Sequence, residues 1–236
     1  MLRRFEIYAL RPDAPAAARE RLRCALRDCA RFIPEVRHSA IGSNLSAAPL
    51  QLVWEHAYAS PEAYQRYMVH PFHADVLDRH LLADSPERVV ADSALGAGLL
   101  GYGCEAADYH LPGGVRRLVL LRLADDAPGN RLRSFATAAH EARAQAPQLA
   151  VSVFAENSFA TRWFDGVSEI PGRRSWTHLW EQGFRSNADL AAYRAGGSTL
   201  AQAERGGWSG WLDGIVESSL EIIYTLEPGW GYEDPG

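Results

Sequence analysis

The segment Tyr67 to His73 reads YMVHPFH and holds the residues of this chain best suited to acid–base chemistry. His70 and His73 are three residues apart around Pro71, and Tyr67 lies six residues before His73. A neutral imidazole with a pKa of about 6.5 is a suitable general base at neutral pH. A phenol that points into an apolar cavity can donate a hydrogen bond to a developing oxyanion. His73 and Tyr67 are therefore candidates for a catalytic base and its oxyanion partner.

Other interpretations of the same segment are structural. A histidine before a proline at a helix junction can cap backbone groups, and we expect this role for His70. His73 can instead be a buried histidine whose hydrogen bonds are satisfied, and Tyr67 can be a core residue. The H-x-x-H spacing permits a metal site completed by His56 or His80. However, no acidic or cysteine ligand lies at a recognised spacing and a proline interrupts the helix, so we expect no metal.

Composition narrows the class of protein. The 236 residues are 47% hydrophobic and 22% charged, as in soluble globular proteins, and the net charge of −5 argues against nucleic acid or an anionic membrane as a partner. No apolar run approaches the length of a membrane span or resembles a signal peptide. Three cysteines in no C-x-x-C pattern fit a reducing cytoplasm. The absence of lysine and the many alanines are typical of a high-GC bacterial genome.

The chain contains an internal repeat. IPEVRHSAIGSN (33–44) matches APQLAVSVFAEN (146–157), and LVWEHAYASPEAYQRY (52–67) matches HLWEQGFRSNADLAAY (178–193), both without gaps. RRFEIYAL (3–10) is echoed by RRLVLLRL (116–123). The second copy carries thirteen extra residues in the region 158–175. We infer a tandem duplication from the order and spacing of these matches.

Each copy predicts the element order βαββαβ. In the first copy, alternation predicts strands at 4–10, 36–42, 50–58 and 88–95. One helix is predicted from the apolar stripe Leu22, Leu26, Cys29 and Ile33, and a second is expected to be capped by Ser60. This order is that of the ferredoxin-like unit, in which two helices cover one face of the sheet and the other face is bare.

The bare sheet face determines the expected architecture. Soluble monomers rarely tolerate several hundred Å² of exposed apolar sheet, and a second copy in the same chain can cover it. We therefore predict an α+β fold in which two ferredoxin-like repeats pack sheet to sheet as a fused dimeric α+β barrel. The expected domains are 1–97 and a degenerate second copy at 115–236, joined by a glycine-rich linker at 98–114. Trp54 and Trp180 occupy equivalent positions on the third strands, and we expect them near the seam of the barrel.

The first copy also resembles a known family. The order of IPEVRHSAIGSN, EHAYAS and YMVHPFH resembles the stress-responsive dimeric α/β barrel (Dabb) family, over about residues 3–96 well and 116–226 weakly. Within that family, the olivetolic acid cyclase type has the same Tyr-x-x-His-Pro-x-His spacing. The resemblance implies that His73 removes an acidic proton from a poly-β-keto substrate and that Tyr67 steadies the carbonyl under attack.

The same resemblance shows where this chain departs from the cyclase type. Arg4 and Leu52 stand where the cyclase has two further histidines, although His178 of the second copy matches the second of them. The second copy keeps Tyr193 but has Thr199 in place of the base. Chemistry of this type is therefore expected in the first copy, with the second copy structural or shaping the substrate site.

These observations give a leading hypothesis and two alternatives. The leading hypothesis is a cofactor-independent cyclase or lyase that acts on a hydrophobic β-keto or polyketide-like molecule, with Trp54, His178 and Tyr193 as substrate-binding candidates. The alternatives are a cofactor-free monooxygenase with the same barrel and a non-catalytic ligand-binding barrel related to stress. We expect a cytoplasmic pseudo-dimer, with a further homodimer possible. The 158–175 insertion and the Gly206 to Gly214 loop are candidates for a lid.

Overall fold

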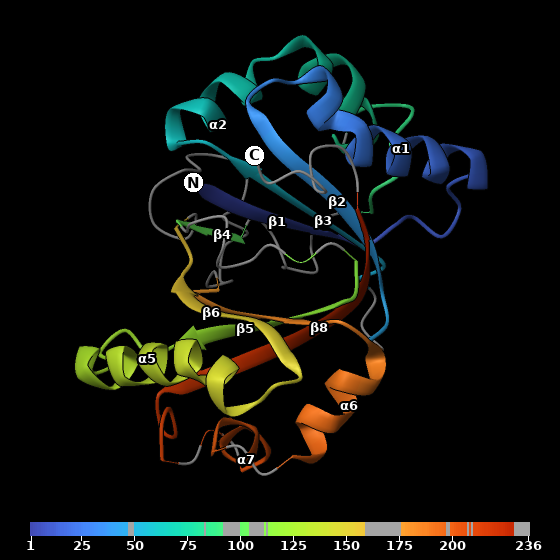
Figure 1. The fold of residues 1–236 in the computed structure, drawn as a ribbon. Coiled ribbons are helices and arrows are strands. Elements are labelled where there is room, and N and C mark those ends of the chain that lie inside the picture. The colour runs from blue at the N-terminus through green and yellow to red at the C-terminus, as the bar shows by residue number, and fades with distance from the viewer. Residues whose placement is uncertain are drawn as a thin grey trace.

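The structure is a computed structural model of the whole chain. It describes residues 1–46, 50–82, 84–91, 100–103, 111, 113–158, 176–196, 199–206, 208 and 210–228. Within these ranges the elements fall into two successive repeats, each with two layers (Figure 1).

The first repeat has four strands and its helices on one side of them. The strands are β1 (Leu2–Tyr8), β2 (Val36–Asn44), β3 (Leu52–Tyr58) and β4 (Leu100–Gly103). The helices are α1 (Ala16–Phe32), α2 (Pro61–Met68), the π-helix η1 (Phe72–Leu77) and α3 (Asp78–Leu81).

The second repeat follows the same plan. Its strands are β5 (Val115–Leu123), β6 (Leu149–Glu156), β7 (His178–Phe184) and β8 (Val216–Pro228). Its helices are α5 (Gly129–Gln145), α6 (Asn187–Ala195) and α7 (Thr199–Arg205).

All eight strands form one antiparallel sheet with the order β4-β1-β3-β2-β8-β5-β7-β6. Each half of this order is the strand order of a ferredoxin-like unit, and β2 pairs with β8 to join the two halves, with Ala40 opposite Pro228 and Asn44 opposite Tyr224. Figure 1 shows the sheet folded so that its two halves face each other, with α1 and α2 on one outer side and α5 and α6 on the other. The predicted α+β fold of two ferredoxin-like repeats packed sheet to sheet is therefore confirmed.

Local sequence explains the helices. The stripe Leu22, Leu26, Cys29 and Ile33 is fully buried against the sheet, as its helical spacing predicts. The Ser60 side chain accepts a hydrogen bond from the Ala63 amide at the start of α2. Ser186 caps α6 in the same way through the amide of Asp189. The two repeats thus use the same capping residue at equivalent positions.

The fourth strand of the first half-sheet is β4, which lies after the predicted segment 88–95; residues 92–95 of that segment lie outside the described residues. Arg88 and Val89 are outside any strand, and Val90 forms only an isolated bridge with Leu10. The strand that pairs with β1 is β4, and Arg3 lies opposite its Tyr102. Hydrophobic residues at 88–95 suggested a strand, but β4 is only four residues long and glycine-rich, so its pattern was too short to detect. β4 lies inside the segment 98–114 that we expected to connect the repeats.

Three large hydrophobic cores hold the layers together, beside a small cluster around Ala57 and Val151. One lies between the first half-sheet and its helices, and a second lies between the second half-sheet and its helices. The third lies between the two half-sheets and draws on both repeats. Its buried members are Phe5, Ile7, Ala40, Leu50, Val53, Tyr102, Leu118, Leu120, Leu179, Ile222, Tyr224 and Leu226.

The two strand-three tryptophans correct a further expectation. Trp54 and Trp180 are equivalent, as predicted, but each faces the helices of its own repeat and not the seam of the barrel. The Trp54 indole donates to Ser39 Oγ at 2.7 Å, and Trp180 donates to Ser152 Oγ at 2.9 Å. Because side chains alternate along a strand, the residues that face the seam are the glutamates that follow each tryptophan.

None of the described helices combines the length and the apolar character needed to cross a lipid bilayer.

Candidate active site

The helix break before His73 positions the predicted catalytic pair. α2 ends at Met68, Pro71 precedes the next helical segment, and η1 places His73 in a π-helical turn. His70 Nδ1 accepts a hydrogen bond from the Phe72 amide at 3.1 Å, which is the capping role expected of this histidine. Single π-helical turns are rare and occur frequently at functional sites.

Tyr67 and His73 meet beneath these helices. Their ring centroids are 4.5 Å apart in an edge-to-face arrangement, with Tyr67 fully buried and His73 6% exposed. Within the described part of the chain, His73 Nδ1 is buried without a hydrogen-bond partner. The pair is thus brought together in the interior, and a hydrogen bond with the backbone of Met68 also holds the His73 ring.

The helix-facing side of β3 forms a wall beside Tyr67. Trp54, His56 and Tyr58 alternate along this strand, with ring centroids 6.4, 6.0 and 5.1 Å from that of Tyr67. His56 lies flat on Trp54 at 3.8 Å between ring centroids. The ring of Tyr64 also lies near Tyr67, with the two ring centroids 6.0 Å apart. Trp54, a predicted substrate-binding residue, therefore lies in the same cluster as His73.

A buried charged group lies below these rings. Arg4 Nη2 is 2.8 Å from Glu6 Oε1, and Tyr8 also donates a hydrogen bond to Glu6. His56 Nε2 is 3.5 Å from Glu6 Oε1, and its Nδ1 is 2.8 Å from the Tyr58 hydroxyl oxygen. These side chains come from β1 and β3, which are neighbours in the sheet. The Glu6 carboxylate therefore lies beside this ring wall, with donors from Arg4 and Tyr8 and the ring of His56 around it.

Burial and charge set the protonation states in this cluster. Burial lowers the pKa of His56 to about 4, and burial also lowers the pKa of His73, although the nearby Asp78 opposes that shift. Burial raises the pKa of Tyr67 well above its usual value. For Glu6, burial acts to raise the pKa, but Arg4 and His56 outweigh it and bring the value to about 2. At neutral pH both imidazoles are therefore neutral, the phenol keeps its proton and Glu6 is ionised.

Asp78 is a carboxylate close to the predicted base His73. Its Oδ2 lies 3.7 Å from His73 Nδ1, one helical turn further along the same stretch of helix. Burial raises the pKa of Asp78, while the neighbouring His73 acts in the opposite direction. Asp78 can therefore orient the imidazole and stabilise the cation formed when His73 takes a proton.

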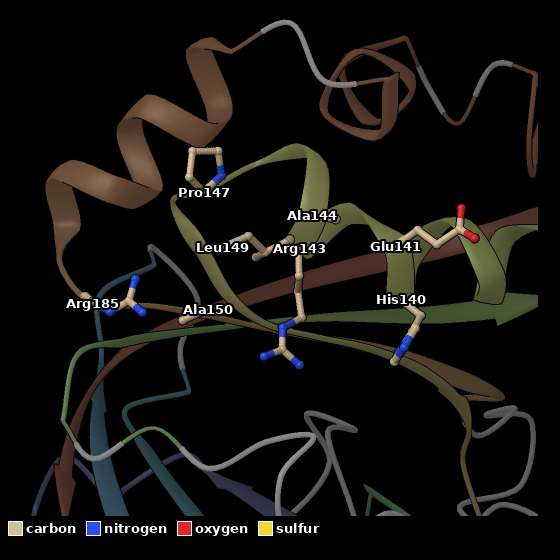
Figure 2. Close-up of a pocket in the computed structure, with 8 residues that line it drawn as sticks. All are labelled: His140, Glu141, Arg143, Ala144, Pro147, Leu149, Ala150 and Arg185. Atoms are coloured by element: carbon tan, nitrogen blue, oxygen red, sulfur yellow. The ribbon is translucent and has the colours of Figure 1, made fainter.

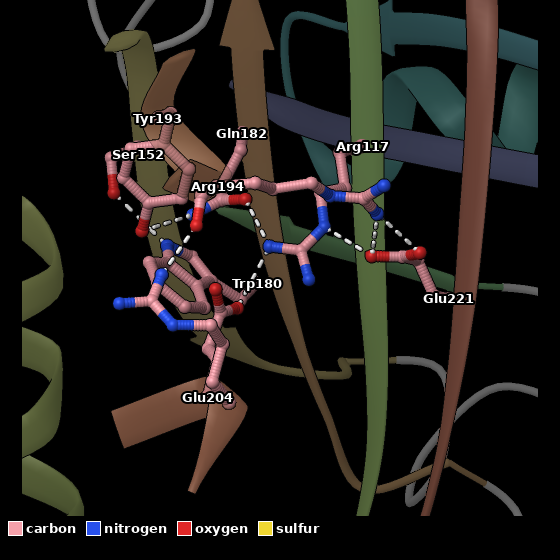
Figure 3. A network of polar contacts seen from close by, with 9 residues as sticks. Arg117, Ser152, Trp180, Gln182, Tyr193, Arg194, Glu204 and Glu221 are labelled. Carbon is pink, nitrogen blue, oxygen red and sulfur yellow. Dashed lines mark hydrogen bonds and ion pairs between the residues drawn. The ribbon is translucent and has the colours of Figure 1, made fainter. Parts of the chain in front are cut away.

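The second repeat has a different polar cluster at the equivalent place (Figure 3). Arg117 donates to Glu221 at 2.5 Å, to Gln182 at 2.5 Å and to Glu204 at 2.7 Å. Gln182 Nε2 donates to the Tyr193 hydroxyl at 3.1 Å. The Tyr193 phenol is thus tied to the strand through an amide, and the guanidinium is surrounded by acceptors.

His178 lies apart from both tyrosines of the prediction. It begins β7, where its ring stacks on Phe154 with centroids 5.3 Å apart and its Nδ1 is 3.1 Å from Thr177 Oγ1. His178 and Tyr193 belong to the second repeat, whereas Trp54, Tyr67 and His73 share the cluster of the first. The five predicted site residues therefore fall into two groups, and only the first brings a base and a phenol together.

Sequence reasoning missed the polar residues of β1 as members of the site. Arg4, Glu6 and Tyr8 alternate with Phe5 and Ile7, which predicts a polar face that points to solvent. In the structure this polar face is covered by helices and is buried. Charged residues are unusual on a strand with both faces covered. Their presence on β1 was the sequence signal that could have identified these residues as part of the site.

Two grooves lie on the outer surface, away from Tyr67 and His73. One of about 570 Å³ runs between α5 and β6, and Figure 2 shows its lining residues. They are His140, Glu141, Arg143, Ala144, Pro147, Leu149, Ala150 and Arg185. The other, also of about 570 Å³, lies between α1 and the helices after Pro71, and Cys24, Val76 and His80 are among its lining residues. Neither contains Tyr67 or His73 in its lining.

The remaining predictions for the site concern metal and the lid. Across the ranges that the structure describes, no three or more histidine, cysteine, aspartate or glutamate side chains gather as a metal site would require. Residues 159–175, nearly all of the proposed lid insertion, lie outside the described residues. In the Gly206 to Gly214 loop, Trp208 and Trp211 pack against Phe135 in the second core.

A comparison with family models gives a match within the first repeat. Residues 2–95 match a family model described as the Stress responsive A/B Barrel Domain. The match ends within the first repeat and contains the YMVHPFH segment. A comparison with curated proteins gives no match.

Solved structures share the fold of the whole chain at low sequence identity. One is called a "putative monooxygenase" from Lactobacillus acidophilus NCFM, at 7% identity and a TM-score of 0.58, covering 98% of this chain and 96% of that one. Another is an anthrone oxidase-like protein at 10% identity and a TM-score of 0.61, with coverages of 96% and 91%. A third is a mutant chlorite dismutase from Candidatus Nitrospira defluvii, at 9% identity and a TM-score of 0.56, with coverages of 96% and 91%. At such identities the likeness concerns the fold alone.

Proposed function

We propose that the chain is a cofactor-independent enzyme of small molecules, because residues 2–95 match the Stress responsive A/B Barrel Domain. The proposed reaction is cyclase- or lyase-type chemistry through an enolate. The observation that carries the proposal is the contact of Tyr67 with His73, whose rings are 4.5 Å apart in the interior of the first repeat.

The proposed chemistry assigns one role to each member of the pair. His73 takes a proton from the carbon next to a carbonyl, and Tyr67 donates a hydrogen bond to the oxygen on which negative charge develops. The enolate carbon then attacks a second carbonyl of the same molecule. A neutral imidazole and a protonated phenol suit these roles. Burial favours both states, because it lowers the pKa of His73 and raises that of Tyr67.

The surrounding residues favour an aromatic or otherwise hydrophobic β-keto compound as substrate. The rings of Trp54, His56, Tyr58 and Tyr64 surround Tyr67, and such rings contact flat apolar groups well. The second repeat is a supporting half in this proposal, because Thr199 replaces the base and Gln182 holds the Tyr193 hydroxyl. Roles for His178 and Tyr193 in shaping the substrate site stay predictions.

A second candidate is a cofactor-free monooxygenase that acts on an activated phenol. The observation in its favour is that the "putative monooxygenase" and the anthrone oxidase-like protein share the fold over both repeats. Such a reaction also begins with deprotonation of the substrate, so His73 keeps its role. Consumption of dissolved oxygen together with substrate would favour this candidate over the cyclase.

Proton abstraction can be tested without knowing the natural substrate. A panel of aryl β-diketones and β-keto esters with one α-proton is incubated with the full chain in D₂O, and loss of the α-proton signal is followed by NMR. We expect exchange faster than in buffer, reduced by about 10²–10⁴-fold in His73→Ala. Tyr67→Phe should slow the exchange more than the matched variant Tyr193→Phe, because the Tyr193 hydroxyl already accepts a hydrogen bond from Gln182.

Three results would count against the proposal or redirect it. Exchange at the buffer rate across the panel would remove the proposed chemistry, and exchange that survives His73→Ala would remove the proposed base. Tight binding of a panel member to both wild type and His73→Ala, without exchange, would indicate a ligand-binding barrel. His140→Ala, at an exposed histidine of the second repeat, controls for general effects of losing an imidazole.

The composition and the repeat of the sequence support a proposal for the compartment and the partners of this enzyme. We propose a cytoplasmic protein of a bacterium that is a pseudo-dimer within one chain and acts on a hydrophobic small molecule without nucleic acid or membrane. Pairing of two whole chains stays a prediction.

A further inference from the structure

His56 is a fully buried titratable residue that the proposed chemistry leaves without a role. It occupies the middle of the β3 wall, stacked on Trp54, with one ring nitrogen toward Glu6 and the other toward Tyr58. The family resemblance did not identify it, because the strand-three histidine of the cyclase type aligns with Leu52.

The neighbours of His56 fix its tautomer. Glu6 is ionised at neutral pH and can only accept hydrogen bonds, so His56 Nε2, 3.5 Å from Glu6 Oε1, carries the proton of the neutral ring. His56 Nδ1 is then an acceptor, and the Tyr58 hydroxyl donates to it at 2.8 Å. Both nitrogens of His56 are therefore directed at residues other than Tyr67.

The second repeat shows what happens when a different residue stands at this place. Gln182 is equivalent to His56, 126 residues later, just as Tyr193 is equivalent to Tyr67. The Gln182 amide donates to the Tyr193 hydroxyl, and its oxygen accepts from Arg117, which is equivalent to Arg4. In the repeat that lacks the base, the phenol is thus tied to the strand.

We propose that His56 is a positioning residue of the first-repeat site, whose orientation toward Glu6 and hydrogen bond with Tyr58 leave the Tyr67 hydroxyl available to a substrate oxygen. The inference rests on the proposed function and deepens it. It explains why the first repeat carries Glu6, His56 and Tyr58 where the second has Val119, Gln182 and Phe184. It also gives the buried Glu6 carboxylate on β1 a role, which is to fix the orientation of His56.

The test replaces His56 by the residue that the second repeat already accommodates. We expect His56→Gln to fold, and its glutamine to bind the Tyr67 hydroxyl as Gln182 binds Tyr193. For α-proton exchange, we expect kcat to fall about tenfold with KM changed less than twofold, because the ground-state contacts remain. Gln182→His, the reverse exchange in the second repeat, should lower kcat less than His56→Gln does.

Two NMR measurements make the inference independent of any substrate. In ¹⁵N-histidine spectra of the full chain at pH 7.5, His56 should carry its proton on Nε2. In spectra with ¹³C-labelled tyrosine, the ζ-carbon resonance of Tyr67 should shift in His56→Gln, while that of Tyr193 should not.

The outcomes separate the inference from the proposed function. An Nδ1-protonated His56, an unshifted Tyr67 resonance, or full kcat in His56→Gln would overturn the positioning role while His73 kept its own. If wild type exchanges no panel proton, the proposed function falls, and the tautomer and the Tyr67 resonance alone decide whether His56 controls the phenol.

Discussion

The guanidinium of Arg3 binds the carboxylate of Glu181 through two hydrogen bonds, from Nε to Oε2 at 2.9 Å and from Nη2 to Oε1 at 2.7 Å. The two residues are 178 positions apart and fully buried between the half-sheets. Arg3 Nη2 also lies 3.1 Å from Glu55, and Arg116 Nε lies 3.7 Å from the same carboxylate. Each repeat thus contributes an arginine and a glutamate at equivalent positions to one central group.

Two tyrosines complete this group symmetrically. Tyr102 donates to Glu181 at 2.5 Å, and Tyr224 donates to Glu55 at 2.6 Å. Tyr102 lies opposite Arg3 on paired strands, and Tyr224 lies opposite Arg116 in the same way. Because the hydrogen bonds run from one repeat to the other, the group fixes how the two half-sheets sit on each other.

Breaking the central ion pair should destabilise the whole chain. In Glu181→Gln, two buried arginines lose one of their two carboxylates, and an uncompensated buried charge typically costs about 3–5 kcal/mol. We expect a loss of this size in the free energy of unfolding measured with urea. Asp13→Asn, which weakens an exposed pair with Arg11, is the control and should cost less than about 1 kcal/mol. Equal losses in both variants would contradict a central role for the Glu181 carboxylate.

Stability should fall in two steps as the pH is lowered. His56 has a folded pKa of about 4, below its ordinary 6.5, so the unfolded chain binds a proton first and the free energy of unfolding decreases from pH 6.5 to 4. The buried His73 and His38 act in the same direction. Glu6 and Glu55 have folded pKa values of about 2, below their ordinary 4.5. Their contribution to the free energy of unfolding is therefore complete above pH 4.5 and is lost as the pH falls to 2.

Urea titrations at successive pH values would measure both steps. His56→Gln should reduce the slope between pH 6.5 and 4 and leave the steeper loss below pH 4.5. If the free energy of unfolding of His56→Gln fell between pH 6.5 and 4 with the same slope as that of wild type, His56 would not titrate in this interval.

The junction between the half-sheets should not accept a side chain at Gly42. A Cβ atom there would collide with the ring of Tyr224 and lie 2.8 Å from the carbonyl oxygen of Thr225. Gly42 belongs to the β2–β8 pairing that joins the repeats, so the strands would have to separate. We expect Gly42→Ala to lower the free energy of unfolding by about 1–3 kcal/mol, as overpacking does.

Gly129→Ala provides the matched control for this substitution. Gly129 begins α5, and the nearest atom to a Cβ there is the mobile end of Arg133 at 3.4 Å. Alanine is the better helix former, so this variant should be neutral or slightly more stable. Thermal melts of both variants side by side give the comparison, and an unaffected Gly42→Ala would mean that β2 and β8 are less closely paired than described.

The sequence predicted the fold and the contact of Tyr67 with His73, but not the polar residues around them. Ungapped repeats and a bare sheet face were enough to predict two ferredoxin-like units packed together, because hydrophobic patterning decides that architecture. The proline in YMVHPFH predicted the break that turns Tyr67 and His73 toward each other. Which side of a strand faces a helix and which faces the other sheet could not be told, since both sides are buried.

That ambiguity accounts for the residues that were misplaced or overlooked. Trp54 was assigned to the seam, although Glu55 lies there. Glu6 and His56 were not recognised as a pair, because they are 50 residues apart in sequence and meet only through the β1–β3 register. Non-local ion pairs of this kind depend on strand register, which periodicity alone does not specify.

The pH dependence of proton abstraction should report the His73–Asp78 pair. The base works only when unprotonated, so the exchange rate should be constant at neutral pH and fall in acid, with an apparent pKa below 6.5 because burial lowers the pKa of His73. The Asp78 carboxylate, 3.7 Å from Nδ1, acts to raise that pKa. In Asp78→Asn the fall of the exchange rate in acid should therefore move to still lower pH.

Asp75→Asn is the control, because Asp75 is an exposed carboxylate on the same helical turn, and it should leave this acid limb in place. An acid limb that is the same in wild type and Asp78→Asn would separate Asp78 from the base, and a limb above pH 6.5 would contradict a desolvated His73.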